Sequence, residues 1–148
     1  MRIETFLNHS PMFAISRAGR RAETLASWLL EEDGLNFLEG LVLAALFLEA
    51  PKPVKPSALA QTFATSRSNV SHCLSSLEAR ALIQRRIDPE DARAYSIVLK
   101  SAGKRSALRV IAAFDAMQRR YEEEIGKPAL RQTLEILRQV DVLSTLKR

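Results

Sequence analysis

The side chains whose types and spacing suggest chemistry lie close together, in residues 66–80. Helical spacing turns four apolar residues of this stretch to one side, namely Val70, Cys73, Leu74 and Leu77. Short polar or basic residues occupy the other side, and those expected to face outward are Arg67, Ser68, Asn69, Ser71, His72, Ser75 and Ser76. The candidate contacts to DNA are Ser66, Arg67, Ser68, Asn69, Ser71, His72 and Ser75. A helix with this outer face can lie in the major groove, where such groups reach base edges and phosphates. The alternative is an ordinary amphipathic surface helix rich in serine.

No catalytic or metal-binding constellation accompanies these residues. Serine is abundant, but no histidine and carboxylate are placed to activate one, and glycine loops that cradle phosphates are lacking. The single cysteine, Cys73, allows no intrachain disulfide and no cysteine-based zinc site. Two histidines, His9 and His72, complete no plausible ligand set. We therefore expect no catalytic residues, no metal and no cofactor, and we expect Cys73 to be a buried, unreactive thiol.

Charge is distributed unevenly along the 148 residues. The net charge of +5 divides into −3 over residues 1–50, +4 over residues 51–100 and +4 over residues 101–148. A basic middle and end indicate a polyanionic partner, although a basic protein without a nucleic-acid role has the same pattern. Apolar residues make up 47% of the chain, yet no apolar run is long enough to cross a bilayer. The length predicts one globular domain, or one domain with appended helices, and the single cysteine suits a location in the reducing cytoplasm.

The elements that position the polar stretch begin with helices. Ser10-Pro11 predicts a helix start, with Ser10 as the N-cap, and Asp33-Gly34 predicts the end of that helix. Asn36 and Glu39 have the spacing of a capping box. They precede a helix from Phe37 to Glu49 that is apolar nearly all round, so we expect it to be the central buried helix.

A helical pair and a hairpin follow a proline-rich linker. The pattern predicts a short helix over residues 57–63, a tight turn over 64–66 and a second helix over 67–81. The apolar period then changes from helical to two, in residues 83–87 and 95–99. Two such runs around a polar turn predict an antiparallel hairpin. Helix, turn, polar-faced helix and hairpin together make a winged helix-turn-helix.

Two long helices complete the chain. Ser101 caps the first, which carries a coiled-coil-like apolar stripe, and Gly126-Lys127-Pro128 breaks it before the second. These apolar sides need a partner surface, so we expect an obligate homodimer. The candidate interface residues are Val110, Phe114, Met117, Tyr121, Leu130, Leu134 and Leu137.

Residues 56–103 resemble the winged helix of the MarR family of bacterial transcriptional regulators. The closest matches are Ser-Arg-Ser-Asn-Val-Ser at 66–71, Leu-Glu-Ala-Arg-Ala-Leu-Ile-Gln-Arg-Arg at 77–86 and Asp-Pro-Glu-Asp-Ala-Arg at 88–93. The flanking helices also fit, so the resemblance covers nearly the whole chain. It implies a mainly α fold with a small β-hairpin wing, in which residues 37–100 form the DNA-binding domain. Residues 1–36 and 101–148 would then form a helical dimerisation region.

The resemblance also implies a function. A homodimer of this family binds double-stranded DNA at a pseudo-palindromic operator, and many members bind small, often phenolic, effectors that reduce DNA affinity. The implied function is a ligand-responsive repressor. Arg93 matches the wing-tip arginine that enters the minor groove in this family, and Asp91 matches the acid that orients it. A guanidinium suits a narrow groove of strongly negative potential.

The chain departs from the family pattern at four positions, one of which is Gly40, where an aromatic residue is common. Ala64 stands where the turn usually carries glycine, which predicts a slightly strained or shifted backbone there, and Ala81 stands where glycine is usual after the second helix. His72 stands where an arginine is frequent, so the helix lacks a fixed positive charge that would contact phosphate or guanine. The weak basicity of the helix supports an alternative class of function, a winged-helix module that docks a partner protein and binds little or no DNA.

Overall fold

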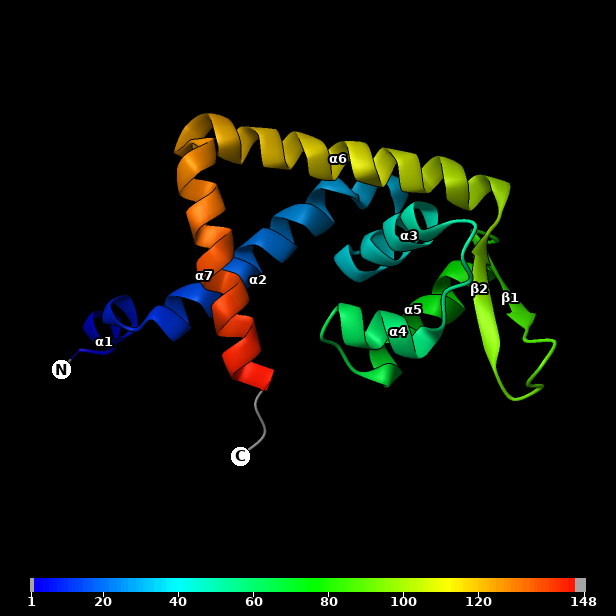
Figure 1. The fold of residues 1–148 in the computed structure, drawn as a ribbon. Coiled ribbons are helices and arrows are strands. Elements are labelled where there is room, and N and C mark those ends of the chain that lie inside the picture. Colours follow the sequence, from blue (N-terminus) through cyan, green and yellow to red (C-terminus); the bar gives the residue numbers. More distant parts are fainter. Residues whose placement is uncertain (1, 146–148) are drawn as a thin grey trace. The chain divides into compact units, whose positions relative to one another are not determined.

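The computed structural model describes residues 2–145, and this part of the chain is mainly helical (Figure 1). The elements in chain order are α1 (Ile3–His9), α2 (Pro11–Leu29), the 3-10 helix η1 (Glu31–Asp33), α3 (Phe37–Glu49), α4 (Pro56–Thr62), α5 (Arg67–Ala79), β1 (Ile83–Ile87), β2 (Tyr95–Leu99), α6 (Ser101–Ile125) and α7 (Lys127–Thr145). The predicted fold class, helices with one small hairpin wing, is confirmed.

The chain packs as two compact units. The first comprises residues 1–111 and holds the winged helix-turn-helix, and the second comprises residues 112–148. In the second unit α6 ends at Ile125, the backbone turns at Gly126 with a φ of 96°, and α7 begins. The sequence predicts a break over Gly126-Lys127-Pro128, but only Gly126 lies outside the helices. Pro128 lies in the first turn of α7, where a missing N–H is tolerated. The division into dimerisation and DNA-binding regions stays a prediction.

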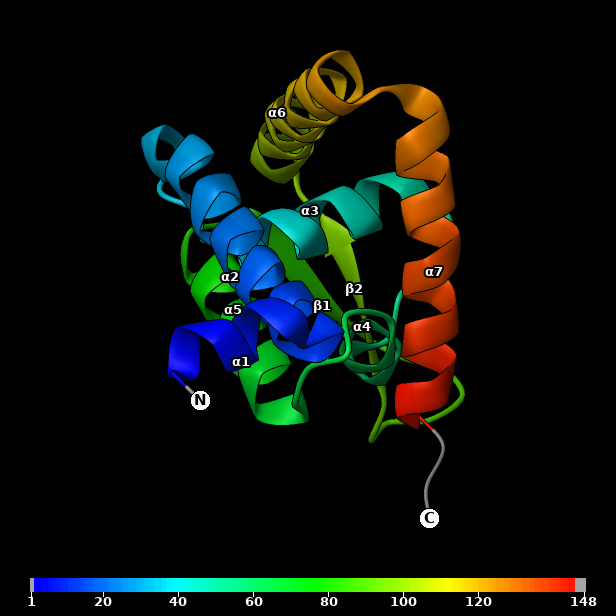
Figure 2. The same ribbon diagram turned by 90° about the vertical axis from the view of Figure 1, so that its left-hand side faces the viewer.

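The two helix starts that the sequence predicts before residue 40, at Pro11 and at Phe37, are both present. The capping box before α3 is formed, with the Asn36 side chain accepting from the Glu39 N–H at 2.9 Å. Gly34 has a left-handed φ of 64°, as predicted, although it ends η1 rather than α2. Ser10 precedes α2, but its hydroxyl makes no capping hydrogen bond. The short helix α1 was not predicted; it packs against α2 at an angle to it (Figure 2).

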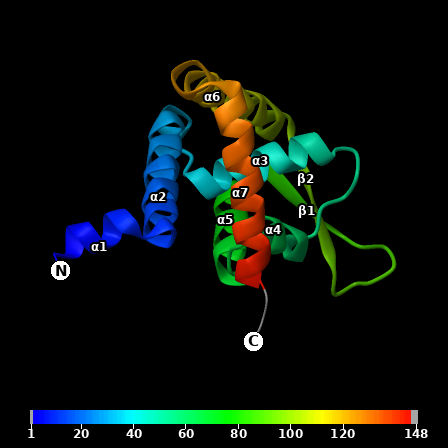
Figure 3. The ribbon, with the colours of Figure 1, turned by 60° about the vertical axis from the view of Figure 1, so that its left-hand side comes forward.

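The core of the first unit surrounds α3. Val42 and Leu43 are fully buried, and α3 packs against α2, α5 and β2. Strand β1 pairs antiparallel with β2, as predicted, and the register runs from Ile83 opposite Leu99 to Ile87 opposite Tyr95. The hairpin extends beyond α4 and α5 (Figures 1 and 3). The base of the hairpin packs closely against the start of α6. Gly103 of α6 lies so near the carbonyl oxygen of Leu82 that a Cβ at this position would overlap that oxygen.

Candidate nucleic-acid interface

Helix α5 is the second helix of the helix-turn-helix, which is called the recognition helix. A tight turn and an apolar inner face hold it in place. Ser66 is its N-cap, and the hydroxyl accepts from the Asn69 N–H at 3.0 Å. Val70, Leu74 and Leu77 are at most 1% exposed. This burial is why the helix docks in one orientation and turns its polar side outward. The helix ends at Ala79, two residues earlier than predicted.

The two alanines in glycine-like positions adopt the backbone that glycine favours. Ala64, in the turn between α4 and α5, has a φ of 48°, and Ala81, after α5, has a φ of 55°. A left-handed residue other than glycine costs about 1–2 kcal/mol, because its Cβ approaches the following carbonyl oxygen. The strain predicted at Ala64 is therefore present in the structure, and Ala81 carries the same strain, which was not predicted.

The structure places every candidate contact residue of α5 at the surface. Ser66, Arg67, Ser68, Asn69, Ser71, His72 and Ser75 are all exposed. Ser76, which was predicted to face outward, is instead half-buried, because its hydroxyl donates to the buried Glu39 carboxylate. One N–H of the Asn69 amide donates to the Thr65 hydroxyl at 3.1 Å. The amide retains its carbonyl oxygen and a second N–H, which are the groups that adenine recognition needs.

Ser75 is engaged with the hairpin. Arg85, on β1, donates from Nη2 to the Ser75 hydroxyl at 3.1 Å, and its Nε lies 3.2 Å from Glu78 Oε2. The same guanidinium lies over the Tyr95 ring, 5.2 Å from its centroid. Arg85 thus joins α5 to both strands of the wing. Sequence reasoning missed this role, and the only available signal was the arginine's place in an alternating strand.

The tip of the wing is a turn organised by backbone hydrogen bonds. The N–H of Asp88 donates to the carbonyl of Ala94 at 3.0 Å, which closes the loop. The N–H of Arg93 donates to Asp91 Oδ1 at 3.0 Å. Asp91 therefore holds the backbone of Arg93, and the Arg93 side chain is exposed.

A hollow of about 520 Å³ brings part of the predicted site together. Arg67 and Ser71 of α5 and Arg93 of the wing all line it. Lys55 and Ser57, at the start of α4, also line it and were not among the predicted contacts. The basic residue directly before Pro56 was the available signal. The lining carries three cationic groups and no carboxylate, so the hollow is suited to an anion such as a backbone phosphate.

The predicted dimer residues differ in exposure. Val110 is fully buried in its own chain. Phe114, Met117, Tyr121 and Leu130 are partly exposed, whereas Leu134 and Leu137 are 52% and 37% exposed. No side chain of α7 among the described residues is buried. The exposed apolar residues leave α7 with surface that a partner could cover.

Cys73 behaves as the sequence predicts. It is a free, buried thiol on the inner face of α5. Burial, assisted by the nearby Glu39 carboxylate, raises the pKa of Cys73 to about 12. Within residues 2–145, no cluster of histidine, cysteine and carboxylate side chains could hold a metal ion. None of the helices described is long and apolar enough to cross a membrane.

The fold and the site define the class: the protein is a winged helix-turn-helix protein. No family model matches the chain. The HTH-type transcriptional regulator PrsX of Escherichia coli is 31% identical over 98 residues, which are 66% of this chain. The matched region spans 59% of the length of PrsX.

Three solved structures identify the architecture within that class. A MarR-family transcriptional regulator from Rhodococcus sp. RHA1 is 25% identical, with a TM-score of 0.77, over 95% of this chain and 96% of the other. CouR from Rhodococcus jostii RHA1, bound to p-coumaroyl-CoA, is 26% identical, with a TM-score of 0.78, over 90% and 93%. MepR of S. aureus in complex with DNA is 20% identical, with a TM-score of 0.80, over 95% and 99%. The chain has the MarR-family fold, and the resemblance predicted from residues 56–103 is confirmed.

Proposed function

We propose that the protein is a cytoplasmic transcriptional regulator that binds duplex DNA as a homodimer and acts as a ligand-responsive repressor. The observation that carries the proposal is the hollow lined by Lys55, Arg67 and Arg93. It adjoins the exposed outer face of α5, whose first turns carry the side chains that we expect to contact base edges. In DNA-binding proteins, contacts to phosphates position the protein on the duplex, and contacts to base edges give sequence specificity. The cationic hollow can supply the first kind of contact, and the polar face of α5 the second.

Homodimerisation is supported by the exposed apolar side chains of α7. A two-fold dimer presents two copies of α5, so its operator should be a pseudo-palindrome. The half-sites should lie about one helical turn apart, which is ~10 base pairs. Within each half-site, Ser68, Asn69, Ser71 and His72 contact base edges, and Arg67 holds phosphate.

A small aromatic or phenolic effector is the regulatory part of the proposal. Support comes from the bound ligand of CouR, p-coumaroyl-CoA, which carries a phenol. Titration of a phenolic acid and of its acyl-CoA ester into the protein–DNA complex, followed by anisotropy, tests it. Release of DNA by either compound supports a ligand-responsive repressor, whereas binding of both without release contradicts that mode.

A salt series separates DNA binding from a protein-docking module. Phosphate contacts release counterions, so the affinity for random duplex should fall steeply between low and physiological salt. A labelled duplex and fluorescence anisotropy measure this fall. Affinity that is weak and independent of salt would favour the alternative, in which α5 docks a partner protein.

A further inference from the structure

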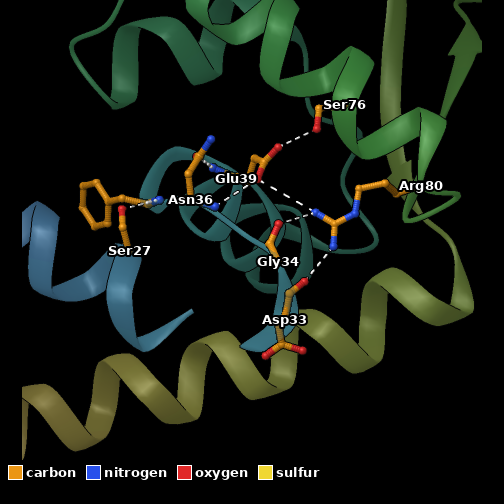
Figure 4. A network of polar contacts seen from close by, with 8 residues as sticks. Ser27, Asp33, Gly34, Asn36, Glu39, Ser76 and Arg80 are labelled. Atoms are coloured by element: carbon orange, nitrogen blue, oxygen red, sulfur yellow. Dashed lines mark hydrogen bonds and ion pairs between the residues drawn. The ribbon is translucent and has the colours of Figure 1, made fainter. Parts of the chain in front are cut away.

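The C-terminal end of the recognition helix is tied to the junction between α2 and α3 (Figure 4). Arg80, directly after α5, donates from Nη2 to the carbonyl oxygen of Asp33 at 2.7 Å and from Nη1 to that of Gly34 at 2.8 Å. These carbonyls belong to the turn that ends η1. One guanidinium thus satisfies two backbone acceptors that are distant in sequence, and it fixes where α5 ends.

A buried carboxylate makes the second tie. Glu39 is 6% exposed, and its Oε2 accepts from the Asn36 N–H at 3.0 Å. Its Oε1 accepts from the Ser76 hydroxyl of α5 at 2.6 Å, and its Oε2 lies 4.0 Å from Arg80 Nη1. A buried charge is costly unless it is paired and hydrogen-bonded, so α5 cannot rotate away from α3 without leaving this carboxylate unsatisfied.

The same junction is tied to α6. The Asp33 carboxylate accepts from Arg109 Nε at 2.7 Å and lies 2.6 Å from Arg109 Nη2. Arg109 also donates to the Ser106 hydroxyl at 3.1 Å. Asp33 therefore binds α5 through its carbonyl and α6 through its carboxylate. All these contacts lie within residues 1–111, so they form one continuous polar network inside the first unit.

We infer that Arg80 and Glu39 are positioning residues for reading the DNA sequence. A 13-residue helix behaves as a rod, so the contacts at its C-terminal end determine where Asn69 and the other early residues point. Hydrogen bonds to base edges require placement within a few tenths of an ångström. Contacts of flexible basic side chains to phosphate tolerate a larger error. The inference rests on the proposed DNA-binding function.

The test compares four full-length proteins on two duplexes. Arg80→Met removes the guanidinium but keeps an unbranched apolar stem, and Ser76→Ala breaks the tie to Glu39 without changing charge. Arg105→Met removes the same charge from α6, outside the network, and is the matched control. Each variant and the wild type are titrated, at several salt concentrations, onto an operator selected by the wild type and onto a random duplex.

We expect the ratio of specific to random affinity to fall about tenfold for Arg80→Met, within the range for one lost base contact. The same ratio should fall about threefold for Ser76→Ala and stay unchanged for Arg105→Met. The salt dependence on random duplex should match the wild type in every case, because the phosphate contacts remain.

Two results would overturn this inference but leave the proposed DNA-binding function standing. One is an unchanged ratio in folded Arg80→Met and Ser76→Ala, with folding checked by circular dichroism. The other is an equal loss on both duplexes with a shallower salt slope, which would make Arg80 a phosphate contact. Ser76→Ala keeps the test decisive if Arg80→Met fails to fold. A wild type that binds neither duplex would overturn the proposed function, and the inference with it.

Discussion

Asp91 and Arg93 are joined at the wing tip by a hydrogen bond from the Arg93 backbone N–H to Asp91 Oδ1, at 3.0 Å. The carboxylate shapes the turn, and Arg93 lines the hollow together with Arg67. The acid therefore orients the arginine through the backbone. This relationship leads to two separable predictions about the wing.

Arg93→Ala should weaken DNA binding by ~1–3 kcal/mol, the range for a single groove contact. The thermal midpoint and the oligomeric state should not change, because the side chain is exposed. Fluorescence anisotropy measures the affinity, and thermal melting measures the stability. Unchanged affinity would remove Arg93 from the DNA interface.

Asp91→Asn and Asp91→Ala should behave differently. Asparagine keeps an oxygen that can accept from the Arg93 N–H, so its DNA affinity should stay near that of the wild type. Alanine removes the acceptor and should weaken binding by about 1 kcal/mol, the usual contribution of one hydrogen bond. If asparagine is as damaging as alanine, the negative charge of Asp91 matters and the backbone explanation is wrong.

Asn69→Ala and Arg67→Ala should have opposite effects on sequence reading. Loss of the Asn69 amide should relax the preference at one position of each half-site more than it weakens non-specific binding. Loss of Arg67 should weaken binding to all sequences and reduce the salt slope by about one. Selection from a random DNA library with each variant measures both effects. If Asn69→Ala selects the same sequences as stringently as the wild type, the predicted register of the recognition helix is wrong.

Ala81→Gly should stabilise the protein. Relief of the left-handed φ of 55° gains about 1–2 kcal/mol, and the greater freedom of unfolded glycine offsets about 0.5–1 kcal/mol of it. The expected net gain is about 0.5–1 kcal/mol in the free energy of unfolding, measured by urea denaturation. Ala79→Gly, at the last residue of α5, is the control and should destabilise the protein by up to about 1 kcal/mol, the cost of glycine in a helix interior. A loss of stability in Ala81→Gly would contradict the strain at this position.

Truncation after Gly126 should leave a protein that is insoluble or unfolded. The deletion removes α7, whose exposed apolar side chains we expect a partner chain to cover. Leu137→Asp in the full chain should shift the protein from dimer toward monomer, and Gln132→Asp, a neighbouring polar position, should not. Light scattering measures the mass of each. A truncated protein that is folded and monomeric would contradict the obligate dimer.

Cys73 should resist thiol reagents until the protein unfolds. Its pKa is raised from the ordinary value of 9.0 to about 12, so almost no thiolate forms in the folded state at pH 8. Above pH 9 the unfolded thiol ionises while the folded one stays protonated, so this group lowers stability as the pH rises toward 12. Reaction with a chromogenic disulfide in native buffer and in urea measures the protection. Rapid native reaction at pH 8 would contradict it.

Much of the fold follows from the sequence alone, because its determinants are local. The capping box joins Asn36 to a residue three positions later, and the antiparallel hairpin follows from two alternating runs around one polar turn. The inner face of α5 follows from helical spacing, and residues with that spacing are the ones that are buried. Arg67 and Ser71 could be selected as site residues for the same reason, since exposure on a regular element is a periodic property. Arg93 lies in the turn between the strands, and the family resemblance indicated it.

The tertiary structure decided which of these residues meet. The sequence assigns Glu39 to a capping box, and only packing brings Ser76, 37 residues away, to its second oxygen. Lys55 joins the hollow because α4 begins beside the wing, and Arg85 reaches both Ser75 and Tyr95 because the hairpin lies against α5. A long, flexible side chain such as that of Arg85 can reach many possible partners, so its position in the sequence does not determine which partner it contacts. The folded backbone makes that choice by fixing which donors and acceptors lie within a few ångströms.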